Sequence, residues 1–298
     1  MTRHIARCKF LYLLLLPVLL DVLIFRYSPM YGLILAFKRY SFSAGIWGSK
    51  WVGFINFQSF FKSPYAWRVI RNTLFISGYL ILFAFPMPIL LALTLNEVRA
   101  NWFKKTVQTI SYMPYFISSV IIASIVNTIL SPDGGAVNII LQKLGMKPVY
   151  FMVEQSYFRA IYTVTSIWRG VGFGAIIYIA AIANVNPELY EAAEMDGASR
   201  LKMIWHITLP GISGVIIIQF ILRIGGILTV DWMDIMLYEN RLIREVTDVI
   251  GTFIYKRGLE DLDYGFSTAL NLMSSVVGFI MVLGSNAMAR RYSEYYLL

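Results

Sequence analysis

Four charged side chains lie inside long apolar stretches of this sequence, where a charge is costly unless something pairs with it. They are Asp21, Arg26, Arg169 and Arg223. A charge in such a setting usually binds a ligand, takes part in ion transfer or pairs with another buried charge. We predict that Asp21, Arg169 and Arg223 lie along a ligand pathway. Arg26 can extend its guanidinium to a polar boundary, and we do not assign it to the pathway.

Arg169 has the most suggestive neighbours. It follows Trp168 and precedes the glycine-rich run Gly170-Val-Gly-Phe-Gly174. An aromatic ring can cover the apolar face of a sugar while a guanidinium pairs with a carboxylate, so these residues suit a sugar acid. The glycines would leave room either for a ligand or for a closely packed helix. The alternative for Arg169 is an internal salt bridge, for which Asp21 is a candidate partner.

The sequence contains none of the usual catalytic motifs. Its only cysteine, Cys8, and its only histidines, His4 and His206, make no zinc-binding spacing, so we expect no metal site. There is no Gly-x-x-x-x-Gly-Lys-Ser/Thr loop to hold a nucleotide phosphate. A nucleophile elbow and a helical His-Glu-x-x-His are also absent. We therefore expect a protein that is not an enzyme and binds no cofactor of its own.

Composition places these residues in a membrane protein. The chain has 298 residues, of which 58% are hydrophobic and 14% charged, and its mean hydropathy is +0.63. A soluble domain of this size could not bury so much apolar surface, so lipid must cover the rest. The net charge of +9 comes from Lys and Arg that flank apolar runs, which favours membrane anchoring over nucleic-acid binding.

Six stretches are long enough to cross a bilayer core of about 30 Å. We predict one all-α transmembrane domain over residues 1–298, with an uncleaved first span. The predicted spans are residues 10–34, 69–95, 105–131, 158–185, 210–231 and 266–289.

Positive charge in short flanking segments sets the expected orientation. Arg3, Arg7 and Lys9 precede the first span, and Arg290 and Arg291 follow the last. Both termini and the segment 186–209 are then cytoplasmic. Residues 35–68, 132–157 and 232–265 lie outside.

The cytoplasmic segment 186–209 carries the clearest motif. Asn186 and Pro187 suit the start of a short helix. Gly197 suits a sharp turn, Ser199 can cap a second helix, and Pro210 is predicted to restart the chain into the fifth span. We therefore predict a hairpin of two short helices.

This segment resembles the EAA loop of permeases from ATP-binding cassette (ABC) importers, in which Glu-Ala-Ala precedes a glycine and then Ile-x-Leu-Pro. The matching positions are Glu191, Ala192, Ala193, Gly197, Ile207, Leu209 and Pro210. The resemblance implies the type I importer permease fold, with the EAA loop between helices 4 and 5 acting as a coupling helix on an ATP-binding subunit. We assign ATPase coupling to these residues and to Asp196.

Other matches extend the resemblance over nearly the whole chain. Trp51-Val-Gly-Phe-Ile-Asn-Phe57 and Arg71-Asn-Thr73 are similar to elements at the start of the second span. Met30-Tyr-Gly-Leu-Ile-Leu-Ala-Phe-Lys38 and Gly45-Ile-Trp-Gly48 point more narrowly to carbohydrate-uptake permeases typified by LplB. That branch includes rhamnogalacturonan and alginate importers.

The resemblance implies a permease that works with a second homologous permease, two ATP-binding cassette subunits and an extracytoplasmic binding protein in the cell inner membrane. ATP and Mg would be bound by the ATPase subunits. The substrate would be an oligosaccharide, and the branch favours an acidic one. The outer segment from Lys38 to Arg68 has five basic residues and no carboxylate, which fits an anionic substrate. Its aromatic residues Trp47, Trp51, Phe54 and Phe57 suit an interfacial belt better than a sugar platform.

Two other classes of protein remain as alternatives. An ion-coupled secondary transporter would also be polytopic, but it would not need the EAA loop and usually has membrane carboxylates, of which only Asp21 is a candidate here. A membrane-embedded enzyme would need a paired acid and base within the spans. A permease for a neutral oligosaccharide is a further alternative within the favoured class.

Overall fold

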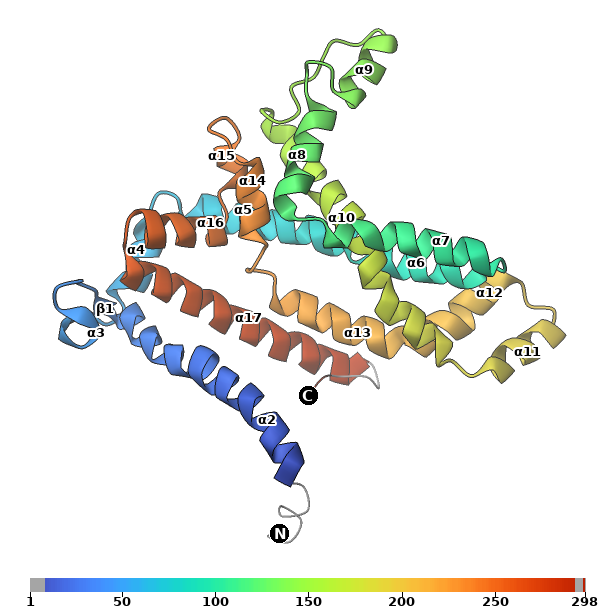
Figure 1. Ribbon diagram of the computed structural model, residues 1–298, viewed down its shortest axis with the longest axis horizontal. Coiled ribbons are helices and arrows are strands. Elements are labelled where there is room, and N and C mark those ends of the chain that lie inside the picture. The colour runs from blue at the N-terminus through green and yellow to red at the C-terminus, as the bar shows by residue number, and fades with distance from the viewer. Residues whose placement is uncertain (1–8, 293–296, 298) are drawn as a thin grey trace. The chain divides into compact units, whose positions relative to one another are not determined.

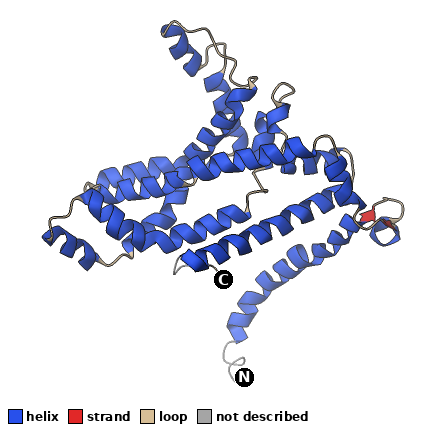
Figure 2. Cartoon of the chain, turned by 180° about the vertical axis from the view of Figure 1, so that it is seen from behind, coloured by secondary structure: helices blue, strands red, loops and turns tan. Residues whose placement is uncertain are grey.

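The chain is almost entirely helical in this computed structural model, which describes residues 9–292 and residue 297 (Figures 1 and 2). It divides into two compact units. One comprises Met1–Pro64 with Ile254–Met273, and the other comprises Tyr65–Phe253 with Ser274–Leu298. The predicted flanking residues Arg3, His4, Arg7 and Cys8 lie outside the described residues. The two units are described separately below.

The first unit begins with a long apolar helical segment. Helix α2 (Lys9–Val22) continues through a π-helical turn, Leu23–Tyr27, into a 3-10 segment, Ser28–Phe37. Strands β1 (Lys38–Arg39) and β2 (Lys50–Trp51) then pair antiparallel, with Lys38 opposite Trp51. Helices α3 (Gly45–Gly48) and α4 (Ile55–Lys62) complete this N-terminal part. The π-helical turn Lys256–Glu260 and the start of α17 (Tyr264–Tyr292) also belong to this unit.

The second unit contains the remaining helices. It begins with α5 (Ala66–Tyr79), which passes through a π-helical turn, Leu80–Ala84, into α6 (Pro86–Glu97). The central helices are α7 (Asn101–Tyr112), α8 (Ser119–Leu130), α9 (Ala136–Lys143) and α10 (Gln155–Ala183). After them come α11 (Pro187–Met195), α12 (Arg200–Met203), the π-helical turn Ile204–Thr208 and α13 (Leu209–Gly225). The last short helices are α14 (Trp232–Tyr238), α15 (Arg244–Thr247) and α16 (Ile250–Tyr255).

Helix α10 organises the core of the second unit because it packs on α6, α7 and α13. One buried cluster joins α6, α10 and α13 through residues such as Ala92, Ala175 and Ile212. A second cluster joins α5, α8, α10 and α14 through residues that include Ile76 and Ile235. Helix α10 therefore contributes residues to both buried clusters.

Apolar side chains also cover the outside of the helices. Leu14, Leu82 and Phe279 are 74%, 66% and 62% exposed, which is the pattern expected when hydrocarbon rather than water surrounds the helices. Among the described residues, five helices are long and apolar enough to span a membrane: Leu13–Phe37, Ala66–Glu97, Gln155–Ala183, Arg200–Gly225 and Tyr264–Arg291. A sixth span requires the bent pair Asn101–Phe116 and Ser119–Leu130 to count as one.

The predicted span over residues 105–131 consists of two helical pieces with a bend between them. The two helical pieces meet at 103°, because Ile117 and Ser118 adopt extended backbone conformations between them. Pro114 lies in the 3-10 turn that closes the first piece, and the Ser118 hydroxyl accepts a hydrogen bond from the amide of Ile121 at the start of the second. A proline and an N-cap four residues later thus break the apolar run.

The helix that contains the predicted fifth span begins before residue 210. Pro210 does not restart the chain, because the helix runs from Arg200 through the π-helical turn into α13 and ends at Gly225 rather than near residue 231. Pro210 has no amide hydrogen to donate to the preceding turn. The π-helical turn ends at Thr208, and the amide of Leu209 bonds to the carbonyl of Ile204. The wider π-helical turn thus accommodates Pro210, which lacks this donor, without ending the helix.

Candidate functional site

The segment predicted to couple the chain to an ATPase forms one helix and a sharp turn. The side chain of Asn186 accepts a hydrogen bond from the amide of Glu188 at 3.1 Å, and Pro187 occupies the first turn of α11. Both features favour helix initiation at this point. Glu191, Ala192 and Ala193 lie on α11, where Glu191 and Ala192 are exposed.

Gly197 ends this helix in a left-handed conformation, with φ of +72°. The amide of Ala198 donates to the carbonyl of Ala193 at 2.9 Å, and the amide of Gly197 donates to that of Glu194 at 3.0 Å. These two bonds are the Schellman arrangement, which satisfies carbonyls at a helix end and favours glycine at the turning residue. Asp196 lies directly before the turn and is exposed.

The second half of the predicted hairpin differs from the prediction. Ser199 precedes α12, but its side chain makes no capping hydrogen bond. Ile207 lies in the π-helical turn, and Leu209 and Pro210 begin α13, so these three motif residues belong to the fifth apolar helix. The hydroxyls of Tyr190 and Thr208 lie 3.0 Å apart and join α11 to that helix. This contact links α11 directly to the π-helical turn that leads into α13.

Arg169 faces a small recess between α8, α10 and α14. Its guanidinium forms an ion pair with Asp234 at 2.5 Å, with side-chain exposures of 28% and 20%. The recess is partly open to the surroundings and has room for about one water molecule. It is lined by Ser119, Ile122, Tyr162, Thr165, Ser166, Arg169, Asp234 and Tyr238. The salt bridge expected as the alternative is therefore present, with Asp234 rather than Asp21 as the partner.

The groups that line the recess carry no net charge, because Arg169 and Asp234 neutralise each other. Burial is the main cause that raises the pKa of the Tyr238 phenol, and the nearby Asp234 carboxylate raises it further. Tyr238 therefore stays protonated at neutral pH and offers a hydroxyl rather than a charge. Asp234 lies in the first turn of α14, and its amide donates to the Asp231 side chain that caps this helix. The recess is thus lined by hydroxyl groups and a neutralised ion pair rather than by a free charge.

The predicted pathway residues Trp168 and Arg223, in the same unit as Arg169, do not line the recess. Trp168 is 43% exposed and does not line the recess. Arg223 is exposed in the last turn of α13, and Asp21 is exposed on α2 in the other unit. The aromatic side chains beside Arg169 are Tyr162 and Tyr238.

The glycine run after Arg169 serves helix packing at two positions. A Cβ atom at Gly172 would overlap the backbone of Ser111 on α7, and one at Gly174 would lie 3.0 Å from Pro88 on α6. Only a residue without a side chain allows α10 to approach these helices so closely. A Cβ atom at Gly170, in contrast, would meet nothing within 4 Å.

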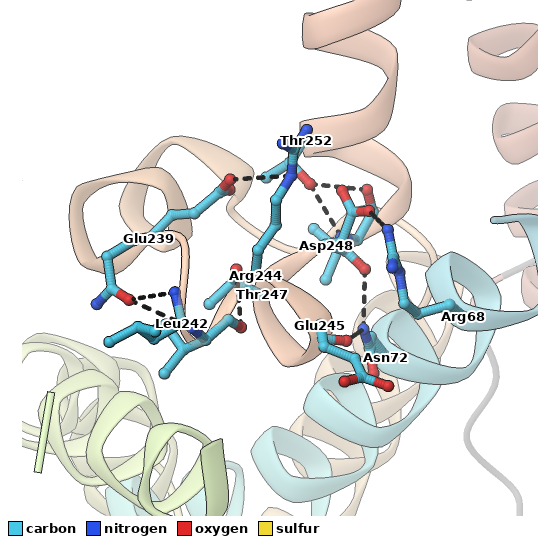
Figure 3. Close-up of polar contacts among 12 residues, drawn as sticks. Arg68, Asn72, Glu239, Leu242, Arg244, Glu245, Thr247, Asp248 and Thr252 are labelled. Atoms are coloured by element: carbon cyan, nitrogen blue, oxygen red, sulfur yellow. Dashed lines mark hydrogen bonds and ion pairs between the residues drawn. The ribbon is translucent and has the colours of Figure 1, made fainter. Parts of the chain in front are cut away.

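A second polar site joins α5 to the segment around α15 and α16 (Figure 3). Arg68 forms an ion pair with the buried Asp248 at 2.6 Å. The amide of the fully buried Asn72 side chain donates to the backbone carbonyls of Glu245 and Asp248 at 2.7 and 3.1 Å. On the same helix, the Thr73 hydroxyl accepts from the amide of Ile250 at 2.9 Å. These contacts fix the outer predicted loop onto α5.

The outer basic segment is less positive than its composition suggests. Lys38 is only 7% exposed, and its ammonium donates to the carbonyls of Ile46 and Trp47 at 2.8 and 3.1 Å. Arg68 is neutralised by Asp248. The exposed basic residues of the segment are then Arg39, Lys50 and Lys62. Within the first unit, Trp51, Phe54 and Phe57 pack around Phe37, with ring centroids 5.5–5.7 Å from it.

Sequence reasoning missed Asp234, Arg71 and Arg159. Asp234 was assigned to an outer loop and was not considered as a partner for a charge within a span. Arg71 and Arg159 lie near the ends of predicted spans, where a charged side chain can reach the membrane surface and does not indicate a site. The spacing of Asp231 and Asp234 is a capping signal that could have placed Asp234 on a helix. Among the described residues, no group of three or more His, Cys, Asp or Glu side chains is arranged to hold a metal ion.

Comparison with known proteins gives close matches along the whole chain. The family profile described as "Binding-protein-dependent transport system inner membrane component" matches residues 84–294. The protein LplB of Bacillus subtilis strain 168 is 43% identical over 97% of this chain and 91% of its own length. The polygalacturonan/rhamnogalacturonan transport system permease protein YteP of the same strain is 42% identical over 96% of this chain and 89% of its own length.

Two solved structures are also similar. One is a chain from a bacterial alginate ABC transporter in complex with an alginate pentasaccharide-bound periplasmic protein. It has a TM-score of 0.91 and 43% identity, and the match covers 100% of this chain and 99% of that one. The other comes from a bacterial ABC transporter involved in the import of the acidic polysaccharide alginate, with a TM-score of 0.89 and 45% identity over 97% and 98% of the two chains.

Proposed function

This chain belongs to the family of inner-membrane components of binding-protein-dependent transport systems, and from that premise we propose that it is a permease subunit that imports acidic oligosaccharides. Membership brings with it the helical fold of an ABC permease and a place in the membrane. The substrate would be a fragment of a polyuronide such as pectin or alginate. An extracytoplasmic binding protein would deliver it.

One observation carries the proposal: the likeness to the alginate transporter chain extends over all of this chain at 43% identity. The match is therefore not confined to residues 84–294, which the general family profile covers. It includes residues 1–83, which lie outside that profile. The permease YteP, named for polygalacturonan and rhamnogalacturonan, supports the same substrate class.

We further propose the partners that such a permease needs. They are a second homologous permease, two ATP-binding cassette subunits that hold ATP and Mg, and a binding protein. The exposed helix α11 and the turn at Gly197 would dock on one ATPase subunit. Small side chains at Ala192 and Ala193 permit close approach, and Glu191 offers a charge for a partner cation or amide. Both termini and residues 186–209 would face the cytoplasm.

The contacts of α11 suggest how motion would enter the membrane part. Closure of the ATPase dimer would shift α11, and the Tyr190–Thr208 contact would pass that shift to the base of α13. Helix α13 packs on α10, which carries Arg169 and the core of the unit. Such a chain of packed elements can couple two access states of a transport pathway.

Reconstitution tests the proposal. The chain, its partner permease, the ATPase subunits and the loaded binding protein are placed together in lipid vesicles. We expect ATP-dependent uptake of an oligogalacturonide or an alginate oligosaccharide, with ATPase activity stimulated by the loaded binding protein. Uptake that needs an ion gradient and no ATP would support a secondary transporter instead. Equal uptake of a neutral oligosaccharide would leave the permease assignment intact and remove the acidic substrate.

A further inference from the structure

Three arginines meet where α5, α10 and α15 contact one another, and only one of them has a carboxylate partner. Arg68 pairs with Asp248 at 2.6 Å. Arg71 lies one turn further along α5, and Arg159 lies in the first turns of α10. Within residues 9–292 and 297, neither Arg71 nor Arg159 forms an ion pair. Both are half-buried.

The position of Arg159 is fixed by two contacts with α5. Its Nη2 atom donates to the Oδ1 atom of Asn72 at 3.3 Å, and its guanidinium carbon lies 4.7 Å from the centre of the Phe75 ring. Asn72 cannot turn away, because its amide nitrogen already donates to two backbone carbonyls. The guanidinium is therefore held in place by a rigid, fully buried residue rather than by a negative charge.

Arg71 shares this face of α5 with Phe75, which is four residues further along the helix. Arg159 contacts Asn72 and Phe75, which follow Arg71 on the same helix, so the two positive charges lie near each other and repel. The Nε atoms of both arginines are buried and have no hydrogen-bond partner. Arginine does not lose its proton in proteins, so this repulsion cannot be relieved by deprotonation.

Excess buried positive charge is stable only when an anion compensates for it. The described part of the chain supplies no carboxylate to Arg71 or Arg159, so a compensating anion can come from another molecule. Arg169 and Arg68 do not compete for it, because Asp234 and Asp248 already neutralise them. The guanidinium of Arg159 therefore lies, without a carboxylate partner, over the Phe75 ring, which is 48% exposed.

We propose that Arg71 and Arg159 form a carboxylate-binding site for a uronate residue of the transported oligosaccharide. The guanidinium groups would hold the carboxylate, and the exposed part of Phe75 would contact an apolar face of the sugar ring. This assignment rests on the proposed function of the chain. It replaces Arg169 and Trp168, which the sequence alone favours, because the charge of Arg169 is already matched.

Uptake by the reconstituted transporter tests the site. The variants are Arg71→Gln, Arg159→Gln and the double variant, with Arg71→Lys and Arg159→Lys as charge-preserving changes. Arg241→Gln, which alters an exposed arginine elsewhere, is the matched control. The probe is a galacturonate or mannuronate trisaccharide, whichever the cognate binding protein binds, and the comparison is its methyl ester. Each Gln change should lower uptake of the acid about tenfold or more, as expected for a lost interaction of roughly 1.4 kcal/mol or more.

The Lys variants should lose less, because they keep the charge but not the planar fork. Basal ATPase activity and assembly should match the wild type, and uptake of the ester should change little. If the wild type does not accept the ester, thermal stabilisation of the purified complex by the free acid decides instead: it should vanish in the double variant. Equal loss for acid and ester, or unchanged uptake and stabilisation in the double variant, would refute the site.

Two other sources of the anion give different results. If a lipid phosphate occupies the site, the Gln variants should differ from wild type only in vesicles that contain anionic lipid. If a carboxylate of the partner permease occupies it, the Gln variants should fail to assemble whatever the substrate. Either result overturns the assignment to sugar. If the wild-type complex itself takes up no acidic oligosaccharide, the proposed function fails, and that outcome is distinct from a normal wild type with silent variants.

Discussion

The guanidinium of Arg169 and the carboxylate of Asp234 neutralise each other in a recess where both side chains are partly exposed. Such a pair contributes little net stability when both partners are present, because the Coulomb attraction is offset by the loss of hydration. The loss of one partner is different, since it leaves the other charge poorly solvated. Removing one partner should therefore destabilise the contact between α10 and α14 by more than the intact pair stabilises it.

This ion pair gives a prediction at the scale of single residues. Arg169→Gln and Asp234→Asn should each destabilise the purified complex by about 1–3 kcal/mol, less than for a fully buried pair because both side chains keep some exposure. The double variant should recover part of that loss, because neither charge is then left alone. Thermal unfolding of the four proteins measures the coupling. A loss of acidic-substrate uptake in Arg169→Gln at unchanged stability, with Asp234→Asn silent, would instead return Arg169 to the substrate pathway.

The residue type and the position of Arg169 could be predicted from the sequence, but its partner could not. A cation in an apolar run stands out in one dimension, whereas its contact with Asp234 joins residues 65 positions apart. The same limit applies to Arg159 and Asn72, which are separated by 87 positions. The Asn186 cap and the Gly197 turn depend on neighbours only a few residues away, and both are visible in the sequence.

At the scale of elements, the Schellman turn after α11 predicts a graded response at Gly197. Proline cannot adopt the observed φ of +72° and should distort the turn, whereas asparagine tolerates a left-handed conformation and should preserve it. We expect Gly197→Pro to reduce substrate-stimulated ATPase activity strongly and Gly197→Asn to retain most of it. Membrane insertion, measured by the amount of purified chain, should be the same for both.

Charge reversal at Glu191 provides an independent check of the same element. Glu191 is exposed on α11, so Glu191→Lys should leave folding intact and weaken only the docking of an ATPase subunit. Normal transport by both Gly197→Pro and Glu191→Lys would exclude this segment as the docking element.

The elements also show where a pattern of apolar residues is ambiguous. The run over 105–131 is apolar throughout, yet Pro114 and Ser118 divide it into two helices. The prolines at 86 and 210 had the opposite outcome, because the helix continues through both. The difference lies in the preceding turn, which is π-helical before Pro86 and Pro210 but not before Pro114. Hydropathy alone does not report that geometry.

At the scale of the whole molecule, the predicted orientation remains to be measured. In a Cys8-free background, Glu194→Cys should react with an impermeant thiol reagent only after the cells are opened, because α11 is predicted to be cytoplasmic. Lys50→Cys, at an exposed position in the predicted outer segment, should react in intact cells and serves as the control. Reaction of the cysteine at 194 from outside would reverse the topology.

Family and membrane location were predictable for the whole chain, because they rest on composition and on a contiguous motif. The number of spans was less certain, since a count of six depends on how the bent pair Asn101–Phe116 and Ser119–Leu130 crosses the membrane. The outer segments were the least predictable. Residues 232–265 read as a loop, but they form three short helices whose contacts with α5 and α10 create the polar sites.

The π-helical turns have a consequence for how this family gains and loses residues. Three of them, Leu23–Tyr27, Leu80–Ala84 and Ile204–Thr208, end two positions before Pro29, Pro86 and Pro210. One residue inserted into a regular α-helix would rotate everything after it by about 100°, and so turn a packed face toward lipid. A π-helical turn stores such an extra residue without that rotation. In homologous sequences, the proline and the surplus residue should accordingly be inherited or deleted together, and single-residue gaps in an alignment should fall just before these prolines.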